Sequence, residues 1–243
     1  MNYVMSDLHG SCPAGRFEDF LMDTLRLEKQ DHLWVLGDVI DRGKHSLELL
    51  EYILFAPNIH LLLGNHEQML LDALVSRRTP LYISQPAAGD EPEEALRLWF
   101  ENGGESTYRS FLRRSKAEQH LLLRGLSSCF YYATVRLPRK TFHLVHANLI
   151  LHGEPGAEYA YPYEMVWDRP DLQSIRFPND AKFPKDPNVI VVGHTPTYYL
   201  GDAYTGKIYT QNPHTFCVDV GTPLTGRLAA LCLETMEELY MRI

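Results

Sequence analysis

The first third of the chain alternates two kinds of hydrophobic pattern. Short apolar runs with the length of strands occur at 2–6, 33–36 and 59–63. After each run, apolar residues recur every three or four positions, as they do on one face of a helix, at 17–25, 46–54 and 69–74. Because strand and helix alternate regularly, this part predicts an α/β fold with a parallel or mixed sheet covered by helices.

The middle of the chain, from about residue 77 to 125, has a different pattern. A polar break that contains glycine and proline, at 85–90, precedes three stretches with helical spacing at 93–101, 106–114 and 116–123. These stretches together are too short to hold a hydrophobic core comfortably by themselves. We therefore expect a helical insertion of about 77–125 within one domain that covers residues 1–243.

Strand patterns return in the second half of the chain. Apolar runs of strand length occur at 129–135, 142–145, 189–192, 216–220 and 228–233. Between two of them, residues 154–187 are rich in proline, which predicts a long surface loop region. The later strands are expected to complete the sheets begun by the first third of the chain.

The overall charge excludes some partners. The chain has 23 lysines and arginines against 31 aspartates and glutamates, a net charge of −8. An acidic protein has no general attraction for nucleic acid or an anionic membrane, so we expect neither as a partner. No signal peptide or membrane-spanning run is visible, and the four scattered cysteines favour free thiols. These features predict a cytoplasmic protein.

Potential metal ligands directly follow several of the predicted strands. They are Asp7 and His9 after the first strand, Asp38 after the second, Asn65 after the third, and His146 and His194 after later strands. In α/β sheets ligands bind beyond the carboxyl ends of the strands, so these side chains are expected to converge. Oxygen and nitrogen donors without thiolate suit Mn²⁺, Fe or Zn²⁺ better than Ca²⁺.

A charge count indicates why such a site would favour phosphate. Two divalent ions bring four positive charges, Asp7 and Asp38 remove two, and a bridging hydroxide removes one. About one positive charge remains before Arg42 is added. Paired metal ions can lower the pKa of a bridging water and stabilise attack on phosphorus. The pattern therefore predicts a phosphoesterase with two metal ions.

The motifs occur in the order of a known family. They are Asp7-Leu8-His9-Gly10, the run Gly-Asp-Val-Ile-Asp-Arg-Gly at 37–43, Gly64-Asn65-His66-Glu67, His146 and Gly193-His194. Together they resemble the signature of phosphoprotein-phosphatase-type, or calcineurin-like, metallophosphoesterases. The run at 64–74 resembles the bacterial and lambda-phage branch of serine/threonine phosphatases. Two positions depart from the family pattern, Leu63 and Asn148.

The resemblance implies a fold and a set of roles. The fold would be an αββα sandwich with two mixed central sheets. Asp7, His9 and Asp38 would hold one metal ion, and Asp38, Asn65, His146 and His194 the other, with Mn²⁺ favoured and Fe, Zn²⁺ or Mg²⁺ as alternatives. His66 would protonate the leaving oxygen and be oriented by Asp41, which is worth roughly 10²–10⁴-fold in rate. The phosphoryl group would be bound by Arg42 and Arg169.

Three functions fit these motifs. The first is a phosphomonoesterase that hydrolyses phosphoserine or phosphothreonine in proteins or peptides by direct attack of a metal-bound hydroxide. The alternative is a dinucleoside-polyphosphate hydrolase of the diadenosine tetraphosphate type, for which the insertion at 77–125 could supply a base pocket. The partner would be a phosphorylated protein in the first case and a small phosphoester in the second. A non-catalytic binding protein is disfavoured, because every proposed ligand and His66 are present.

Several other features are interpreted as structural. The aromatic group Trp99, Phe100, Tyr108 and Phe111 has helical spacing and is interpreted as packing within the insertion. The arginine pairs at 77–78 and 113–114 are interpreted as solvated helix faces. His143 lies close to His146 in the sequence but falls on the other face of the strand, so we expect it to lie away from the metal centre.

Overall fold

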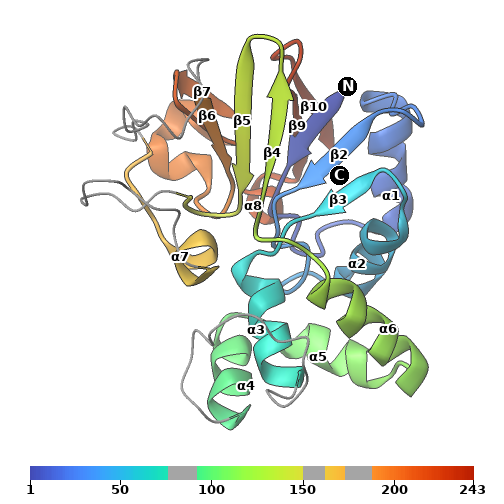
Figure 1. Ribbon diagram of the computed structural model, residues 1–243. Coiled ribbons are helices and arrows are strands. Elements are labelled where there is room, and N and C mark those ends of the chain that lie inside the picture. The colour runs from blue at the N-terminus through green and yellow to red at the C-terminus, as the bar shows by residue number, and fades with distance from the viewer. Residues whose placement is uncertain (76–91, 150–161, 173–187) are drawn as a thin grey trace.

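Two five-stranded mixed sheets form the centre of the part of the molecule that the structure describes (Figure 1). This computed structural model describes residues 1–75, 92–149, 162–172 and 188–243. The first sheet has the order β10-β9-β1-β2-β3. Its strands are β1 (Asn2–Met5), β2 (His32–Val35), β3 (Ile59–Leu61), β9 (Arg227–Cys232) and β10 (Glu238–Arg242).

The second sheet has the order β4-β5-β6-β8-β7. Its strands are β4 (Tyr132–Leu137), β5 (Lys140–Val145), β6 (Asn188–Val192), β7 (Tyr209–Asn212) and β8 (Thr215–Cys217). In each sheet three neighbouring strands pair in parallel, β1-β2-β3 in the first and β5-β6-β8 in the second. The remaining pairs, β1-β9 and β9-β10 in the first sheet and β4-β5 and β7-β8 in the second, are antiparallel. The carboxyl ends of the parallel strands carry the motifs.

Alternation along each strand explains why the sheets stack. On β1, Val4 packs into the core between the sheets, whereas Met5 packs into the core beneath the helices of the first sheet. On β6, Val191 joins the core between the sheets and Ile190 joins the outer core of the second sheet. Because successive side chains of a strand point to opposite faces, both faces of each sheet are buried. The predicted sandwich with two mixed sheets is confirmed.

Helices cover the outer faces of the two sheets. The first sheet packs against α1 (Ala14–Asp19), the π-helical turn η1 (Phe20–Thr24) and α2 (Ser46–Phe55). Met165 of α7 (Pro162–Trp167) packs into the outer core of the second sheet. Short helical turns follow β6 and β8 in the chain: η2 (Thr197–Leu200), η3 (Asp202–Tyr204) and α8 (Thr222–Thr225).

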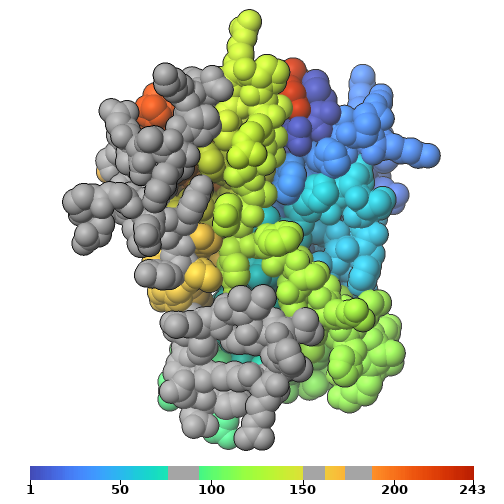
Figure 2. Space-filling model, in the orientation of Figure 1, coloured from blue at the N-terminus to red at the C-terminus, as the bar shows by residue number. Residues whose placement is uncertain are grey.

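Four helices gather at the end of the sheets where the motifs lie (Figure 1). They are α3 (Asn65–Leu74), α4 (Pro92–Glu101), α5 (Glu105–Leu112) and α6 (Lys116–Ser127). Trp99, Phe111 and Leu122 of these helices share one core with Leu50 of α2. On the face in Figure 2 the green segment of α6 lies directly against the blue and cyan segments. This packing supports the expected insertion within one domain, which stays a prediction.

The structure corrects some of the predicted elements. The segment 154–187, expected to be loop, contains α7 in its described part, because Pro162 is well suited to the first position of a helix. The edge strands β7 and β10 were not predicted, and the strand expected at 129–135 begins at Tyr132. The polar break at 85–90 and the arginines at 77–78 lie outside the described residues. In the described part, no helix has the length and apolar character needed to span a bilayer.

Candidate metal centre

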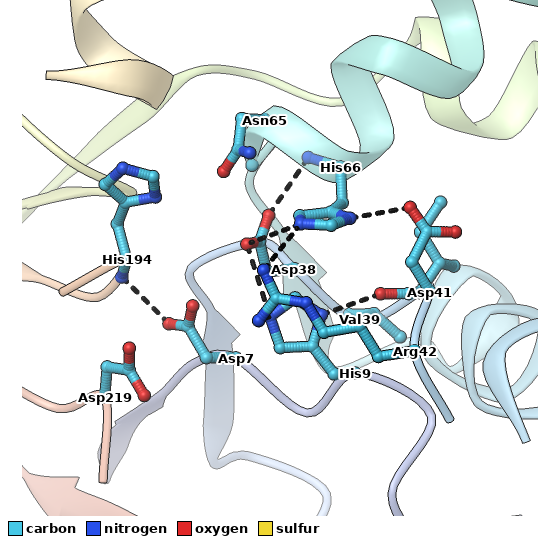
Figure 3. Close-up of polar contacts among 12 residues, drawn as sticks. Asp7, His9, Asp38, Val39, Asp41, Arg42, Asn65, His66, His194 and Asp219 are labelled. Carbon is cyan, nitrogen blue, oxygen red and sulfur yellow. Dashed lines mark hydrogen bonds and ion pairs between the residues drawn. The ribbon is translucent and has the colours of Figure 1, made fainter. Parts of the chain in front are cut away.

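The predicted ligands meet where the carboxyl ends of the parallel strands face one another (Figure 3). Asp7 and His9 follow β1, Asp38 follows β2, and Asn65 is the first residue of α3. The second sheet contributes His146 after β5 and His194 after β6. All six side chains are buried, with at most 6% of their surface exposed. Side chains that are far apart in the sequence thus form one buried polar site.

The backbone at this site takes an unusual conformation. Positive φ angles occur at Asp7 (55°), His9 (44°), Asp38 (53°), Arg42 (65°) and His194 (61°). Left-handed backbone costs an L-residue roughly 1–2 kcal/mol, although aspartate and histidine adopt it more often than most. Each residue turns the chain sharply after a strand, so that its side chain points into the site. This strain is offset by the rest of the fold.

Two glycines of the motifs permit the close approach of the carboxylates. A Cβ atom at Gly64 would overlap Oδ1 of Asp38, and one at Gly193 would overlap Oδ2 of Asp7. Any larger residue at these positions would have to displace a proposed metal ligand. The need for glycine here is therefore steric and specific to the site.

Ligand atoms gather in two clusters that share Asp38. One cluster contains His9, Asp38 and His66, and the other contains Asp38, His146 and His194. Within each cluster the ligand atoms lie within 4.8 Å of one another. Nε2 of His146 is 3.1 Å from Oδ1 of Asn65 and 3.4 Å from Oδ1 of Asp38. The arrangement suits two cations held on either side of one carboxylate.

Hydrogen bonds to backbone carbonyls determine which ring nitrogens face this site. Nδ1 of His9 lies 2.9 Å from the carbonyl oxygen of Ile40, and Nδ1 of His146 lies 2.6 Å from that of Leu36. A carbonyl oxygen can only accept, so Nδ1 carries the proton in both rings. In a neutral ring, Nε2 is then an acceptor. Nε2 of His146 faces the acceptor Oδ1 of Asn65, and Nε2 of His9 faces Oδ2 of Asp38 as well as the guanidinium of Arg42. A metal ion satisfies such a donor set, so these residues fit the predicted metals.

The electrostatics of the site also favour a cation. Burial lowers the pKa of His9 to about 3, with further lowering by His66 and Arg42. Burial, followed by the neighbouring His146, lowers the pKa of His194 to about 2. Both rings are therefore neutral at physiological pH and available as ligands. Burial and then the charges of Asp7 and Glu67 raise the pKa of Asp38, because an ionised carboxylate is unfavourable when it is buried beside other negative charges.

Asp7 lies beside the two clusters and faces the same cavity. Its Oδ2 accepts a hydrogen bond of 3.0 Å from the backbone N–H of His194, which joins the first sheet to the second. The buried Asp219, which the sequence analysis did not single out, lies next to it (Figure 3). Burial and then Asp7 raise the pKa of Asp219. The concentration of buried carboxylates adds to the need for positive charge.

Both predicted arginines reach the site. Arg42 donates to Nε2 of His9 at 3.0 Å and to Nε2 of His66 at 3.2 Å. Nε2 has one lone pair, so this hydrogen bond to His9 and a metal ion at the same atom exclude each other. Arg169, which the sequence analysis expected on the long loop region at 154–187, lines the same cavity as Asp7 and Asp38.

The predicted pair of His66 and Asp41 is present and fully buried. Nδ1 of His66 lies 2.6 Å from Oδ2 of Asp41, and the indole N–H of Trp99 donates to the same oxygen at 2.7 Å. Burial raises the pKa of Asp41 to about 7, although hydrogen bonds from Thr107 and Trp99 act in the opposite direction. Burial and then Arg42 lower the pKa of His66. The contact with Trp99 was not predicted, since that residue was interpreted as packing alone.

Glu67 has a role that the motif alone did not reveal. Its carboxylate accepts backbone N–H bonds from Asp38 (2.7 Å), Val39 (2.9 Å), Ile40 (3.3 Å) and Gly64 (3.1 Å). The first three donors belong to the loop after β2, and the fourth precedes α3. Glu67 therefore holds the loop of Asp38 against the start of the helix that carries Asn65 and His66.

The two departures from the family pattern have local explanations. Asn148 donates to Oδ2 of Asp168 at 2.7 Å, and Oδ1 of Asp168 accepts from the backbone N–H of Arg169 at 2.8 Å. The asparagine thus braces the segment that carries Arg169. Leu63 is buried in the core and its N–H donates to the carbonyl of Phe130. As predicted, His143 lies elsewhere, with Nε2 3.0 Å from Oδ1 of Asn188.

Five of the six proposed ligands, all except His146, form one wall of a cavity of about 380 Å³. Apolar and aromatic residues line another part of it: Trp167, Pro196, Tyr198, Tyr199, Pro223 and Leu224. Tyr199 is 68% exposed and Leu224 is 77% exposed, so they lie at the mouth. The rings of Tyr198 and Tyr199 are 4.4 Å apart, at an angle of 44°. The cavity therefore combines a polar floor with an aromatic rim.

The chain belongs to the calcineurin-like phosphoesterase family, which it matches over residues 3–221. The clusters of potential metal ligands agree with this family match. The expected metallophosphoesterase family is therefore confirmed. The finer assignment to the serine/threonine phosphatase branch does not follow from this match.

Relatives of this chain are named for an activity other than that of a serine/threonine phosphatase. A symmetrical bis(5'-nucleosyl)-tetraphosphatase of Glaesserella parasuis is 36% identical over 183 residues, which cover 71% of this chain and 61% of the relative. One of Haemophilus ducreyi is 42% identical over 77 residues, 30% of this chain and 27% of the relative. The chain thus spans less than two thirds of the length of these relatives.

A solved structure has the same fold. The crystal structure of a proposed diadenosine tetraphosphatase superposes with a TM-score of 0.58 at 16% identity. The match covers 99% of this chain and 92% of that chain. At this identity the likeness concerns the arrangement of the sheets and helices.

Proposed function

We propose that this protein hydrolyses dinucleoside polyphosphates of the diadenosine tetraphosphate type at a dinuclear metal centre. The aromatic rim above the two ligand clusters carries the proposal, because Tyr198 and Tyr199 offer faces on which a nucleobase can stack. The named activity of the Glaesserella parasuis relative supports the same substrate class. In this reading the base binds at the rim and the phosphate chain extends toward the polar floor.

We assign the metal ligands as the sequence motifs suggest. Asp7, His9 and Asp38 hold one divalent ion, and Asp38, Asn65, His146 and His194 hold the other. When bound, such ions activate water as a nucleophile and neutralise charge on the phosphoryl oxygens. The clustered acceptors support this assignment, whereas the identity of the metal is open, with Mn²⁺ as the first ion to test.

The remaining polar residues orient the substrate and move one proton. Arg42 and Arg169, which line the same cavity, bind phosphoryl oxygens. Nδ1 of His66 stays bonded to Asp41. Nε2, which accepts from Arg42 in this structure, would donate a proton to the leaving oxygen once Arg42 turns to the phosphate and the ring has taken up a second proton. Because the site is buried, these charges act in a low dielectric and are stronger than at a surface.

The competing function is a phosphatase for phosphoserine or phosphothreonine in proteins. It rests on the complete motifs at 37–43 and 64–67 and needs the same metal ligands. The two functions differ in what the cavity binds beside the phosphate. A nucleotide requires the aromatic rim, whereas a phosphorylated side chain requires little beyond the arginines and metal ions.

Substrate comparison separates these functions. Metal-free protein is supplied with Mn²⁺, Zn²⁺, Mg²⁺ or Fe²⁺ and assayed on diadenosine tetraphosphate, a phosphoserine peptide and p-nitrophenyl phosphate. We expect the dinucleotide to have the highest kcat/KM. A higher value for the phosphopeptide would favour the phosphatase, and no turnover with any metal would refute catalysis.

A variant at the rim tests the observation that carries the proposal. Tyr199→Ala should lower kcat/KM for diadenosine tetraphosphate about tenfold, because one stacking contact is worth roughly 1–3 kcal/mol. Activity on p-nitrophenyl phosphate should stay within about twofold, since that substrate has no base. Phe130→Ala is the matched control, as this aromatic residue is 75% exposed and does not line the cavity. Equal losses on both substrates would contradict base stacking.

A further inference from the structure

The carboxylate of Asp41 receives hydrogen bonds from two parts of the chain. Nδ1 of His66 and Nε1 of Trp99 lie 2.6 Å and 2.7 Å from the same oxygen, Oδ2. Trp99 belongs to α4 and is 58 residues away in the sequence. The backbone N–H of Asp41 donates to Oγ1 of Thr107 on α5 at 3.2 Å. Two helices of the middle segment thus contact the residue that orients His66.

The position of the Trp99 ring is closely determined. The ring is fully buried, and a Cβ atom at Gly104 would overlap it. The preceding Gly103, with a φ of +96°, accepts the backbone N–H of Arg42 at 3.3 Å through its carbonyl. One turn between α4 and α5 therefore fits around the indole and also contacts the loop that carries Asp41 and Arg42.

Packing alone does not account for this arrangement. An indole buried for its apolar surface needs only one acceptor for its N–H, and a backbone carbonyl would serve. Here the acceptor is the carboxylate that already holds His66, and hydrogen bonds to a charged acceptor are about twice as strong as neutral ones. The second donor restricts rotation of the Asp41 carboxylate and hence the orientation of the imidazole.

We propose that Trp99 is a positioning residue for proton donation by His66, and that α4 and α5 serve to hold the Asp41–His66 pair. The inference rests on the role of His66 in the proposed function. It gives the insertion a part in the reaction, through Trp99 and Thr107, that does not depend on which phosphoester is bound. Trp99 acts through Asp41 and touches neither substrate nor metal.

Trp99→Phe tests this role because it keeps an aromatic ring and removes the N–H donor. The readout is kcat on phenyl phosphate, whose leaving group needs protonation, against p-nitrophenyl phosphate, whose leaving group needs little. We expect kcat to fall about tenfold on the first and less than about twofold on the second. KM and bound metal should not change. Equal losses on both substrates would overturn the proposal.

Two controls separate positioning from general damage. Phe111→Leu alters the same core from α5 and should lower stability without changing the ratio of the two kcat values. In the double variant Trp99→Phe with His66→Asn, the loss should equal that of His66→Asn alone, because both changes act on one proton transfer. An additional loss in the double variant would mean that Trp99 acts by another route.

A measurement without turnover keeps the inference testable if the proposed function fails. The chain has three tryptophans, and the indole of Trp34 donates to the neutral amide oxygen of Asn2 at 3.2 Å. In ¹⁵N-labelled protein, the Trp99 indole proton should resonate downfield of that of Trp34, because its acceptor is a carboxylate. A resonance at or upfield of Trp34 would refute the hydrogen bond. Absence of all phosphoesterase activity would instead refute the proposed function.

Discussion

At the scale of single residues, Asp38 connects the two halves of the site. Its Oδ1 lies 3.4 Å from Nε2 of His146, and its Oδ2 lies 3.5 Å from Nε2 of His9. Oδ1 also accepts the backbone N–H of His66 at the start of α3, which fixes the rotation of the carboxylate. Each oxygen therefore faces a different cluster, an arrangement that allows one carboxylate to serve two ions.

Changing Asp38 should empty both metal positions. Asp38→Asn keeps the size of the side chain, but the amide carries no charge and has only one oxygen to offer. We expect the variant to lose both ions on dialysis, as measured by elemental analysis. His143→Gln is the control, because His143 is equally buried but contacts Asn188 away from the site. Retention of both ions by Asp38→Asn would contradict a shared ligand.

The sequence indicated best the residues whose roles depend on their neighbours along the chain, and it missed roles that depend on contacts made only in the folded protein. The ligands directly follow strands and sit in short motifs, so the chain itself indicated where they would meet. Trp99 could not be assigned, because its contact with Asp41 depends on how α4 packs against α3 beside the loop after β2. Glu67 lies inside a motif, yet its role required knowing that the loop after β2 lies against α3.

At the scale of elements, the carboxylate of Glu67 joins a loop to a helix. It satisfies N–H groups that neither β2 nor α3 can satisfy internally, since the first turn of a helix leaves such donors free. The dipole at the start of α3 also favours a negative charge at this position. Glu67 therefore joins the loop of Asp38 and the helix of Asn65 and His66 into one hydrogen-bonded unit.

Removing the charge of Glu67 should loosen this unit. In Glu67→Gln an amide NH₂ would replace one carboxylate oxygen and face backbone N–H groups, leaving buried donors unsatisfied. We expect the free energy of unfolding to fall by about 3 kcal/mol, measured by urea denaturation. Glu94→Gln on α4, an exposed position, should change it by less than about 0.5 kcal/mol. Equal effects would show that Glu67 is not a brace.

The two strands that the sequence did not predict share a physical cause, and the unpredicted helix α7 has another. Both β7 and β10 lie at sheet edges, and β10 is only partly buried along its length. An edge strand packs on fewer neighbours, so its hydrophobic alternation is weak. The six-residue helix α7 is too short to show a helical period. Central strands, buried on both faces, gave long apolar runs and were predicted well.

At the scale of the whole molecule, the proposed function requires a chain with a net charge of −8 to bind a polyanion. The described site resolves this conflict locally, because buried carboxylates and neutral histidines together require cations. Bound ions would then supply the positive charge that the surface lacks. Metal binding and substrate binding are thus expected to be coupled through charge.

The stabilising effect of metal should increase with pH. Burial and the charges of Asp7 and Glu67 raise the pKa of Asp38, so it must release a proton before it binds metal. Affinity therefore rises as pH rises through that pKa, whereas His9 and His194 are already neutral. At about 100 times the Kd, Mn²⁺ should add about 2.7 kcal/mol, or roughly 5–10 °C in Tm. Thermal melts at several pH values between 5.5 and 7.5 measure this, and a constant shift would contradict it.

The positive φ angles at the site bear on how this protein can change over generations. Glycine at Asp7, Asp38 or His194 would relax a costly backbone conformation, but it would also remove a proposed ligand. At these positions, selection for a relaxed backbone and selection for the chemistry oppose each other. Persistence of aspartate and histidine in these turns requires continued selection for the chemistry itself.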